Sequence, residues 1–185
     1  SSTWFGKDVY DLDQSLRFED GDTAYLSKTL STPTNNKKWT YSCWTKRGNL
    51  GSYQYLIDAS ASGSQERLYW ANDDTLIYNT YIGSTDYIQL ISTAVFRDTS
   101  AWYHITLSVD TTQGTSANRI KLYVNNVLQS LSTATYPSQN YDTKINSAVA
   151  HRIGSRTYDS ASPLDGYLAE VNFIDGLALG PYDFG

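Results

Sequence analysis

The stretch that most constrains the fold is residues 101–131, AWYHITLSVDTTQGTSANRIKLYVNNVLQSL. Apolar and polar residues alternate over residues 102–109 and again over residues 120–125, and a period of two is typical of strands whose two faces differ. Asn125-Asn126 follows at the point where a two-residue hairpin turn requires positive φ, which Asn tolerates better than most residues. We therefore expect two strands, a tight turn and a return strand over residues 127–131.

The rest of the chain carries the same kind of pattern. Residues 39–46 have large side chains on both faces, and residues 167–174 are apolar on both faces, so we expect two central strands that are covered on both sides. Residues 67–79 predict a hairpin, and residues 15–18 and 24–27 predict a pair of strands. Because turn residues recur about every ten positions and helical periodicity is almost absent, the sequence predicts an all-β fold, a two-sheet antiparallel jelly-roll sandwich.

Composition limits the partners of this chain of 185 residues. Its net charge is −5 and its pI is about 4.8, so it should repel phosphate backbones, and we expect no nucleic-acid partner. It has no run of about 18 apolar residues, and we expect no membrane insertion. The single Cys43 lies among aromatic residues and predicts a buried thiol. We divide the chain into residues 1–14, an N-terminal arm or extra edge strand, and residues 15–185, one jelly-roll domain.

Three segments resemble a known family. They are the aromatic strand WTYSCWTK, the unit AWYHITLSVD with RIKLYVNNVL, and HRIGSR with LDGYLAEVNFIDGLAL. Together they resemble the laminin-G-like, concanavalin A-like lectin/glucanase jelly rolls over roughly residues 15–185. The segments SLRFEDGDTAYLSKT, STAVFRDTSAWYH and DGYLAEVNFIDG most resemble modules in structural proteins of tailed bacteriophages, especially marine ones. The resemblance implies a sandwich fold and a virion setting.

Catalysis is not expected. The glucanases that the chain resembles use a Glu-x-Asp-x-Glu strand motif, which places two carboxylates on one strand face. Here the residue two positions after Glu170 is Asn172, and Asp175 should point to the opposite face. The two histidines, His104 and His151, do not lie in a nucleophile signature, and we expect His104 to be structural. We therefore assign no catalytic residue and disfavour a glycoside hydrolase.

A calcium ion is an optional ligand rather than a required cofactor. The resemblance implies a cation at the rim of the sandwich, and hard cations bind clustered oxygen atoms. The oxygen-rich candidates are Asp20 with Asp22, Asn72 with Asp73 and Asp74, and Asp159 with Asp165. Our first choice is Asp73 with Asp74, although hairpin turns favour the same residues and the turn interpretation is preferred.

A sugar site would use the tyrosines that we place in loops. Sugars stack on aromatic rings and accept hydrogen bonds from polar side chains, whereas the alternative roles for a Tyr are strand packing and protein contact. The aromatic candidates are Tyr53, Tyr55, Tyr81, Tyr87, Tyr141 and Tyr158, with Arg156 and Asp159 as polar partners. From these we select Tyr53, Tyr81, Tyr141, Arg156, Tyr158 and Asp159 as the carbohydrate-binding set.

These observations predict a non-enzymatic structural module of a phage virion, in capsid decoration or a tail fibre, that attaches to host-surface glycans. Its location would be the virion surface or the extracellular space. Its partners would be other virion proteins and like subunits, with Trp4, Phe5 and Tyr10 of the arm as subunit contacts. The alternatives are a free extracellular calcium-dependent lectin and, less favoured, a glycoside hydrolase.

Overall fold

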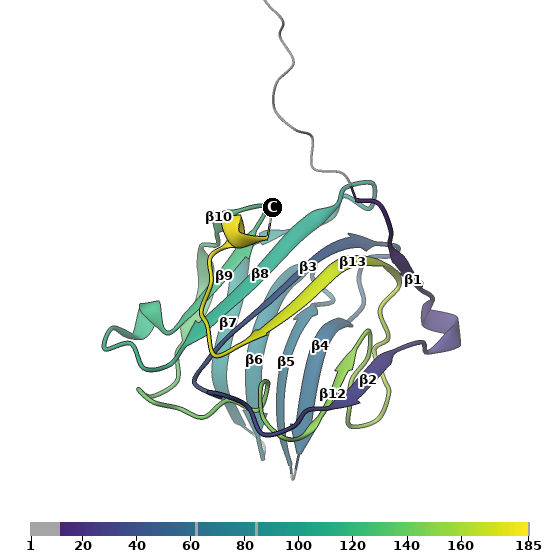
Figure 1. Cartoon of the computed structure of the whole chain (residues 1–185). Coiled ribbons are helices and arrows are strands. Elements are labelled where there is room, and N and C mark those ends of the chain that lie inside the picture. The colour runs from purple at the N-terminus through teal and green to yellow at the C-terminus, as the bar shows by residue number, and fades with distance from the viewer. Residues whose placement is uncertain (1–11, 62, 84, 185) are drawn as a thin grey trace, which may run out of the picture.

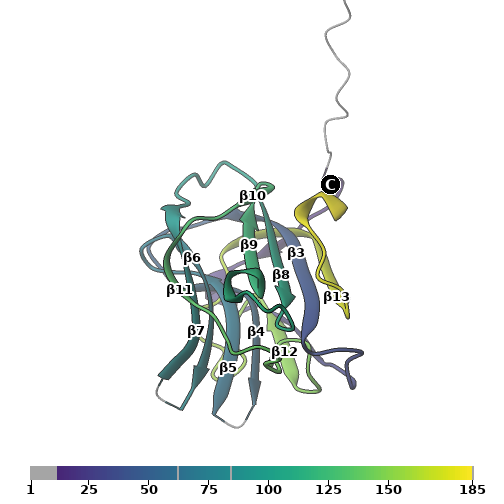
Figure 2. The ribbon, with the colours of Figure 1, turned by 90° about the vertical axis from the view of Figure 1, so that its left-hand side faces the viewer.

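A computed structural model of the protein describes residues 12–61, 63–83 and 85–184. Two antiparallel sheets face one another, and the side-on view in Figure 2 separates the two layers. The narrow sheet has six strands in the order β1-β13-β3-β8-β9-β10 and lies nearer to the viewer in Figure 1. The wide sheet has seven strands in the order β11-β7-β6-β5-β4-β12-β2. The predicted all-β, two-sheet antiparallel sandwich is confirmed.

The bounds of the elements follow the chain. The strands of the narrow sheet are β1 (Leu16–Phe18), β3 (Lys38–Arg47), β8 (Tyr103–Asp110), β9 (Ile120–Val124), β10 (Val127–Leu128) and β13 (Gly166–Asp175). Those of the wide sheet are β2 (Leu26–Thr29), β4 (Gln54–Ala61), β5 (Ser64–Trp70), β6 (Thr75–Ile82), β7 (Thr85–Val95), β11 (Leu131–Thr135) and β12 (Ala150–Ile153). Three short 3-10 helices complete the described part of the chain: η1 (Asp20–Asp22), η2 (Ser116–Asn118) and η3 (Pro181–Asp183). Among the described residues, no helix is long and apolar enough to cross a membrane.

The core lies between the two sheets, because one face of every long strand is apolar. Figure 1 shows β13, β3 and β8 in front of β4 to β7, with the interior between them. The wide sheet contributes Leu68, Trp70, Leu76, Tyr78, Ile88 and Leu90, and the narrow sheet contributes Trp39, Tyr41, Cys43, Ile105, Leu107 and Val109. Cys43 is fully buried, and burial raises the pKa of its thiol to about 12. The prediction of a buried thiol is therefore confirmed.

The central hairpin matches the prediction up to its turn. Asn125 and Asn126 have φ of 50° and 65°, and Val127 pairs with Val124 in β9. The predicted return strand over residues 127–131 is wrong in its extent, because β10 ends at Leu128. From Leu131 the chain joins β7 in the wide sheet as β11, so this segment crosses from one sheet to the other.

The predicted pairing of residues 15–18 with residues 24–27 is also wrong. Residues 16–18 form β1, which pairs with β13 in the narrow sheet. The helix η1 follows, and Thr23 has a φ of 50°. This tight turn carries the chain to the wide sheet, where β2 pairs with β12 instead of β1.

The remaining predictions concern residues 1–14 and the central strands. Trp4, Phe5 and Tyr10 lie outside the described residues. Both strands predicted to be central are flanked on each side: β3 lies between β13 and β8, and β13 lies between β1 and β3. The predicted coverage of both faces is confirmed for β3, which is largely buried, but is only partial for β13, where Glu170 is exposed and most of the residues after it are half-buried.

A buried carboxyl ties a loop to the wide sheet. Glu66 is completely buried on β5, accepts a hydrogen bond from Tyr78 Oη, and accepts another from the backbone N–H of Lys144 at 2.7 Å. Burial raises its pKa from 4.5 to about 7, although the Tyr78 and Lys144 hydrogen bonds oppose the shift. The folded state therefore binds this proton more tightly than the unfolded state does.

This shift predicts a pH-dependent stability. Because the folded-state pKa is the higher one, proton binding to Glu66 makes its full contribution to the free energy of unfolding below about pH 4.5. This contribution is lost as the pH rises through about 7. Relative to Glu66→Gln, the wild-type free energy of unfolding should fall by roughly 1–3 kcal/mol between pH 4.5 and pH 8. Urea denaturation of both proteins across this range measures the difference, and parallel pH profiles would contradict the assignment.

Candidate functional site

Polar side chains form a continuous row across the outer face of the wide sheet, the face turned away from the core. Each residue of the row stands directly opposite the next in the antiparallel register, and residues that stand opposite in this way project from the same face. The members of this polar row, from β2 to β11, are Ser27, Arg152, Asp58, Arg67, Asn79, Gln89 and Thr135.

An apolar row runs beside the polar row on the same face. Tyr55 pairs with Tyr69, Tyr69 pairs with Ile77, and Ile77 pairs with Ile91 in the strand register. These residues form a second apolar cluster that is distinct from the core. The rings of Tyr55 and Tyr69 stack with their centroids 4.9 Å apart. The outer face therefore offers an aromatic surface next to hydrogen-bonding groups.

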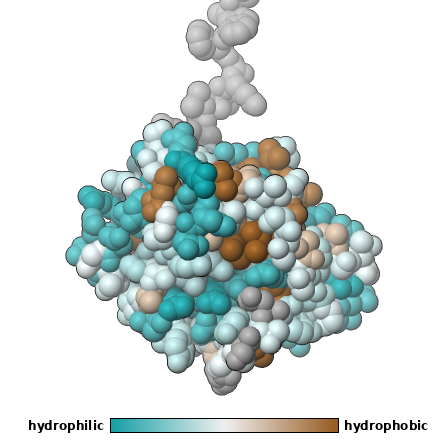
Figure 3. All heavy atoms as spheres, turned by 180° about the vertical axis from the view of Figure 1, so that it is seen from behind, coloured by the Kyte–Doolittle hydropathy of each residue, from teal (hydrophilic) through white to brown (hydrophobic). Residues whose placement is uncertain are grey.

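A pocket of about 270 Å³ lies where the two rows meet. Figure 3 looks onto this side of the molecule, where hydrophilic side chains surround small hydrophobic areas. The pocket is lined by Tyr53, Tyr55, Arg67, Tyr69, Asn79, Tyr81, Gln89, Arg156 and Ser162. Such a combination of aromatic walls with a few convergent polar groups is the usual composition of a small-ligand site.

Arg67 lines the pocket beside three of its tyrosine rings. Its Nε donates a hydrogen bond to Asn79 Oδ1 at 3.0 Å, and its Nη1 donates one to Tyr55 Oη at 3.2 Å. The guanidinium carbon lies 6.0, 5.8 and 5.5 Å from the ring centroids of Tyr55, Tyr69 and Tyr81. Burial raises the pKa of Tyr55 even though Arg67 and Arg156 oppose the shift, so this hydroxyl stays protonated at neutral pH.

The loop between β12 and β13 supplies the second arginine. Arg156 Nε donates to Asp159 Oδ1 at 2.8 Å, and a second contact joins Arg156 Nη2 to Asp159 Oδ2. This carboxylate raises the pKa of the Arg156 guanidinium. The polar row anchors the loop, because Arg152 Nη1 donates to the Arg156 carbonyl at 3.0 Å and Asp58 Oδ1 accepts from Thr157 N at 2.8 Å.

The structure brings part of the predicted sugar set together. Tyr53, Tyr81 and Arg156 line the pocket. Asp159 is not part of the lining but accepts a hydrogen bond from Arg156.

The other two predicted tyrosines lie apart from the pocket. Tyr158 is 75% exposed and lies beside a different depression, next to Ser60 and Gln65. Tyr141 stacks on Tyr87 with a centroid separation of 5.2 Å. Neither ring lines the pocket.

Sequence reasoning missed the strand residues of the pocket. Arg67 and Tyr69 of β5 and Asn79 of β6 point outward, whereas Leu68 and Tyr78 between them point into the core. The signal was present in the hairpin pattern, because an apolar inner face implies a complementary outer face.

His104 belongs to a hydrogen-bonded trio on the narrow sheet. Its Nε2 lies 2.8 Å from Ser42 Oγ, and its Nδ1 lies 3.2 Å from Asn126 Oδ1. This is the order of nucleophile, base and orienting group found in hydrolases. Ser42 is completely buried and His104 is 2% exposed, so a substrate cannot reach the hydroxyl. The trio therefore fits the structural role that we expected for His104.

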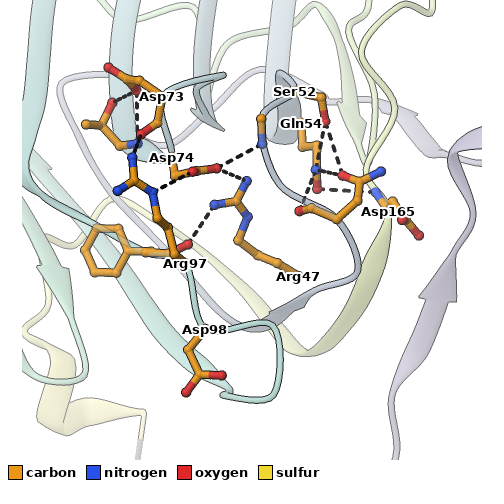
Figure 4. A network of polar contacts seen from close by, with 12 residues as sticks. Arg47, Ser52, Gln54, Asp73, Asp74, Arg97, Asp98 and Asp165 are labelled. Atoms are coloured by element: carbon orange, nitrogen blue, oxygen red, sulfur yellow. Dashed lines mark hydrogen bonds and ion pairs between the residues drawn. The ribbon is translucent and has the colours of Figure 1, made fainter.

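The first calcium candidate already has protein partners. Asp74 pairs with Arg47 at 3.1 Å and with Arg97 at 2.9 Å, and its Oδ1 accepts a hydrogen bond from Gly51 N (Figure 4). Burial raises the pKa of Asp74, but Gly51 and the two guanidiniums outweigh this effect and hold it below the ordinary value. Because two positive charges already occupy this carboxylate, its surroundings do not fit a calcium ion.

Asp73 serves the hairpin turn beside Asp74. Its Oδ1 accepts hydrogen bonds from Thr75 N at 3.1 Å and from Thr75 Oγ1 at 2.7 Å. These contacts are those of an Asx turn, the role that we preferred for this residue.

A different acidic group forms at the rim. Glu19, Asp20 and Asp165 each place a carboxylate oxygen within 4.8 Å of the others. Burial and the neighbouring Asp20 and Glu19 raise the pKa of Asp165. This group joins Asp20 and Asp165 of two separate sequence candidates, and it lies outside the pocket lining.

Two further cavities open between the sheets along one edge of the sandwich. They have volumes of about 360 and 310 Å³ and share Leu26 of β2. Their linings are mainly apolar, with Leu16 and Phe18 in one and Tyr41 and Phe173 in the other. One of them also includes Lys28, His151 and Arg152, but neither combines polar groups with more than two phenylalanine or tyrosine rings. The outer-face pocket combines four tyrosines with two arginines and two amides, and we therefore take it as the candidate site.

The sequence comparison agrees with this architecture. Residues 19–181 match the model of the concanavalin A-like lectin/glucanases superfamily. The chain belongs to this superfamily. No curated protein sequence matches the chain.

Solved structures share the fold of this concanavalin A-like chain at low sequence identity. A heptameric SAP-like pentraxin from Limulus polyphemus is 15% identical with a TM-score of 0.60, and the match covers 86% of this chain and 73% of the pentraxin. The CBM40 of a Ruminococcus gnavus IT-sialidase is also 15% identical with a TM-score of 0.60, over 88% and 96% of the two chains. Domain 4 of an extracellular arabinanase from Geobacillus stearothermophilus, in complex with arabinotriose, is 17% identical with a TM-score of 0.57, over 84% and 67%.

The Asp74 network predicts a large difference between two truncations. Asp74→Ala leaves the guanidinium of Arg47, which is 0% exposed, without a counter-charge, and should lower the free energy of unfolding by about 3–5 kcal/mol. Arg97→Ala removes a side chain that is 60% exposed and should cost less than about 1 kcal/mol. Urea denaturation measures both values, and equal losses would show that the Arg47 pair is not the structural contact.

Proposed function

We propose that this chain is a non-catalytic carbohydrate-binding module, and that it binds a saccharide in the pocket on the outer face of the wide sheet. The observation that carries the proposal is the meeting of tyrosine rings with arginine and amide side chains in one hollow. A sugar ring has apolar C–H faces and a rim of hydroxyl groups. The tyrosines would receive a C–H face, and Arg67, Asn79 and Gln89 would serve the hydroxyls.

The similar structures support this assignment, because some proteins with this fold are described with carbohydrate. Two of them are described as a carbohydrate-binding module from a sialidase and a domain in complex with arabinotriose. They share no more than 17% of their residues with this chain. The sugar that this chain binds must therefore be inferred from its own pocket.

The placement of the carboxylates supports a non-enzymatic role. Glycoside hydrolysis generally uses two carboxyl groups that flank the scissile bond. Glu66 is completely buried in the core, and Glu170 lies exposed on β13 of the narrow sheet. The described lining of the pocket contains no carboxylate, so a bound sugar would meet no pair of carboxyl groups there.

For the setting, we propose the surface of a bacteriophage particle, as a capsid decoration or a tail-fibre component that attaches to host glycans. This part of the proposal is supported by the resemblance of residues 15–29, 92–104 and 165–176 to modules of phage structural proteins. The partners would be other virion proteins and like subunits. A free extracellular lectin would use the same pocket. The binding experiment below therefore tests the pocket for a virion protein and for a free lectin alike.

A glycan array followed by calorimetry tests the pocket directly. Tyr81→Ala should weaken binding of the best array ligand roughly tenfold or more, because it removes one aromatic wall. Tyr158→Ala, which removes an equally large ring that is 75% exposed and outside the pocket, should change the affinity less than about twofold.

Two outcomes would contradict the proposal. The first is that Tyr158→Ala abolishes saccharide binding while Tyr81→Ala leaves it intact. The second is that no saccharide on the array binds the chain. A parallel array with a chelator tests the calcium-dependent lectin, since we expect the pocket to bind without a metal ion.

A further inference from the structure

The charge of the pocket differs from the charge of the whole protein. The chain has a net charge of −5, yet the described residues that line the pocket include two arginines and no acidic residue. Positive groups that converge in a hollow of an acidic protein focus a local field that attracts anions.

The two arginines differ in what neutralises them. Arg156 is paired with Asp159 through both carboxylate oxygens. Among the described residues, Arg67 forms no ion pair. Arg67 is therefore the positive charge in the pocket that a ligand would meet.

The nearest acidic side chain in the register forms no ion pair with Arg67. Asp58 stands opposite Arg67 between β4 and β5, but its Oδ1 accepts hydrogen bonds from Thr157 N and Ser60 Oγ. Burial raises its pKa, although Thr157, Ser60 and Arg67 oppose the shift. Asp58 thus holds the loop in place, and its charge attracts Arg67 without forming an ion pair with the guanidinium.

The guanidinium of Arg67 is held in position but is not saturated. Nε and one hydrogen of Nη1 donate to Asn79 and Tyr55. A guanidinium has five N–H donors in a planar fork, so Nη2 and the second hydrogen of Nη1 remain for a ligand. A pre-positioned fork with spare donors suits the two oxygens of a carboxylate better than a single hydroxyl.

We propose that the pocket selects an acidic saccharide, with Arg67 receiving a carboxylate of the sugar while the tyrosines hold the ring. The inference rests on the proposed carbohydrate-binding function and names the ligand class of the same site. Asn79 and Tyr55 also position the guanidinium, because each accepts one of its hydrogen bonds.

Matched ligand pairs test the inference on the intact chain. Calorimetry would compare trigalacturonate with its methyl ester, and sialyllactose with lactose, because each pair differs by the negative charge. The acidic member of at least one pair should bind roughly tenfold to a hundredfold more tightly, and this preference should shrink at high salt.

Variants then assign the preference to Arg67. Arg67→Gln should remove the preference, and Arg67→Lys should keep only part of it, because a lysine retains the charge but loses the fork. Arg17→Gln is the matched control, since Arg17 is exposed on β1 and pairs with Glu19. Thermal unfolding checks that each variant is folded.

The outcomes separate the two levels of the proposal. If the acidic and neutral members of each pair bind equally, and Tyr81→Ala still weakens both, the preference for an acidic saccharide is wrong. The carbohydrate-binding function would then stand. A preference for acids that survives in Arg67→Gln would also overturn the role of Arg67. No binding of any saccharide, in the array or here, would overturn both.

Discussion

The antiparallel register of the wide sheet is the constraint on which the rest of the structure depends. Side chains alternate along a strand, so the pairing of Arg67 with Asn79 sends both to the outer face and sends Leu68 and Tyr78 into the core. A slip of one residue would exchange these two sets and expose the apolar side chains to water. The hydrophobic core therefore stabilises the sandwich and also holds the pocket in place.

Three arginine environments show how the charge is distributed. Arg47 is completely buried and is neutralised by Asp74, which makes it part of the framework. Arg152 stacks over Tyr25, with 4.0 Å between its guanidinium carbon and the ring centroid, and anchors the loop between β12 and β13. Arg67 alone combines a place in the pocket with the absence of an ion pair among the described residues. The guanidinium without an ion pair is therefore the one that lies in the proposed ligand site.

The fold could be predicted because its strongest signals are local. The alternation in residues 102–109 and the turn at Asn125-Asn126 need no distant information. The pocket was predicted only in part, through Tyr53, Tyr81 and Arg156. Which strand residues line the pocket depends on which positions face one another across β4 to β7. This register shifts at two irregular pairings, between Tyr55 and Ile57 and between Thr80 and Tyr81. Such shifts arise from packing over the whole sheet, so the local sequence pattern does not reveal them.

We propose that the outer face of the wide sheet binds the saccharide. Backbone amide NMR tests it most directly, by titrating the isotopically labelled chain with the tightest ligand from the array and mapping the shifted resonances. We predict that the largest shifts fall on β5, β6 and the loop that carries Arg156, around the lining of the pocket. Shifts concentrated at the acidic rim of Glu19, Asp20 and Asp165, or along the edge cavities beside β2, would contradict the claim.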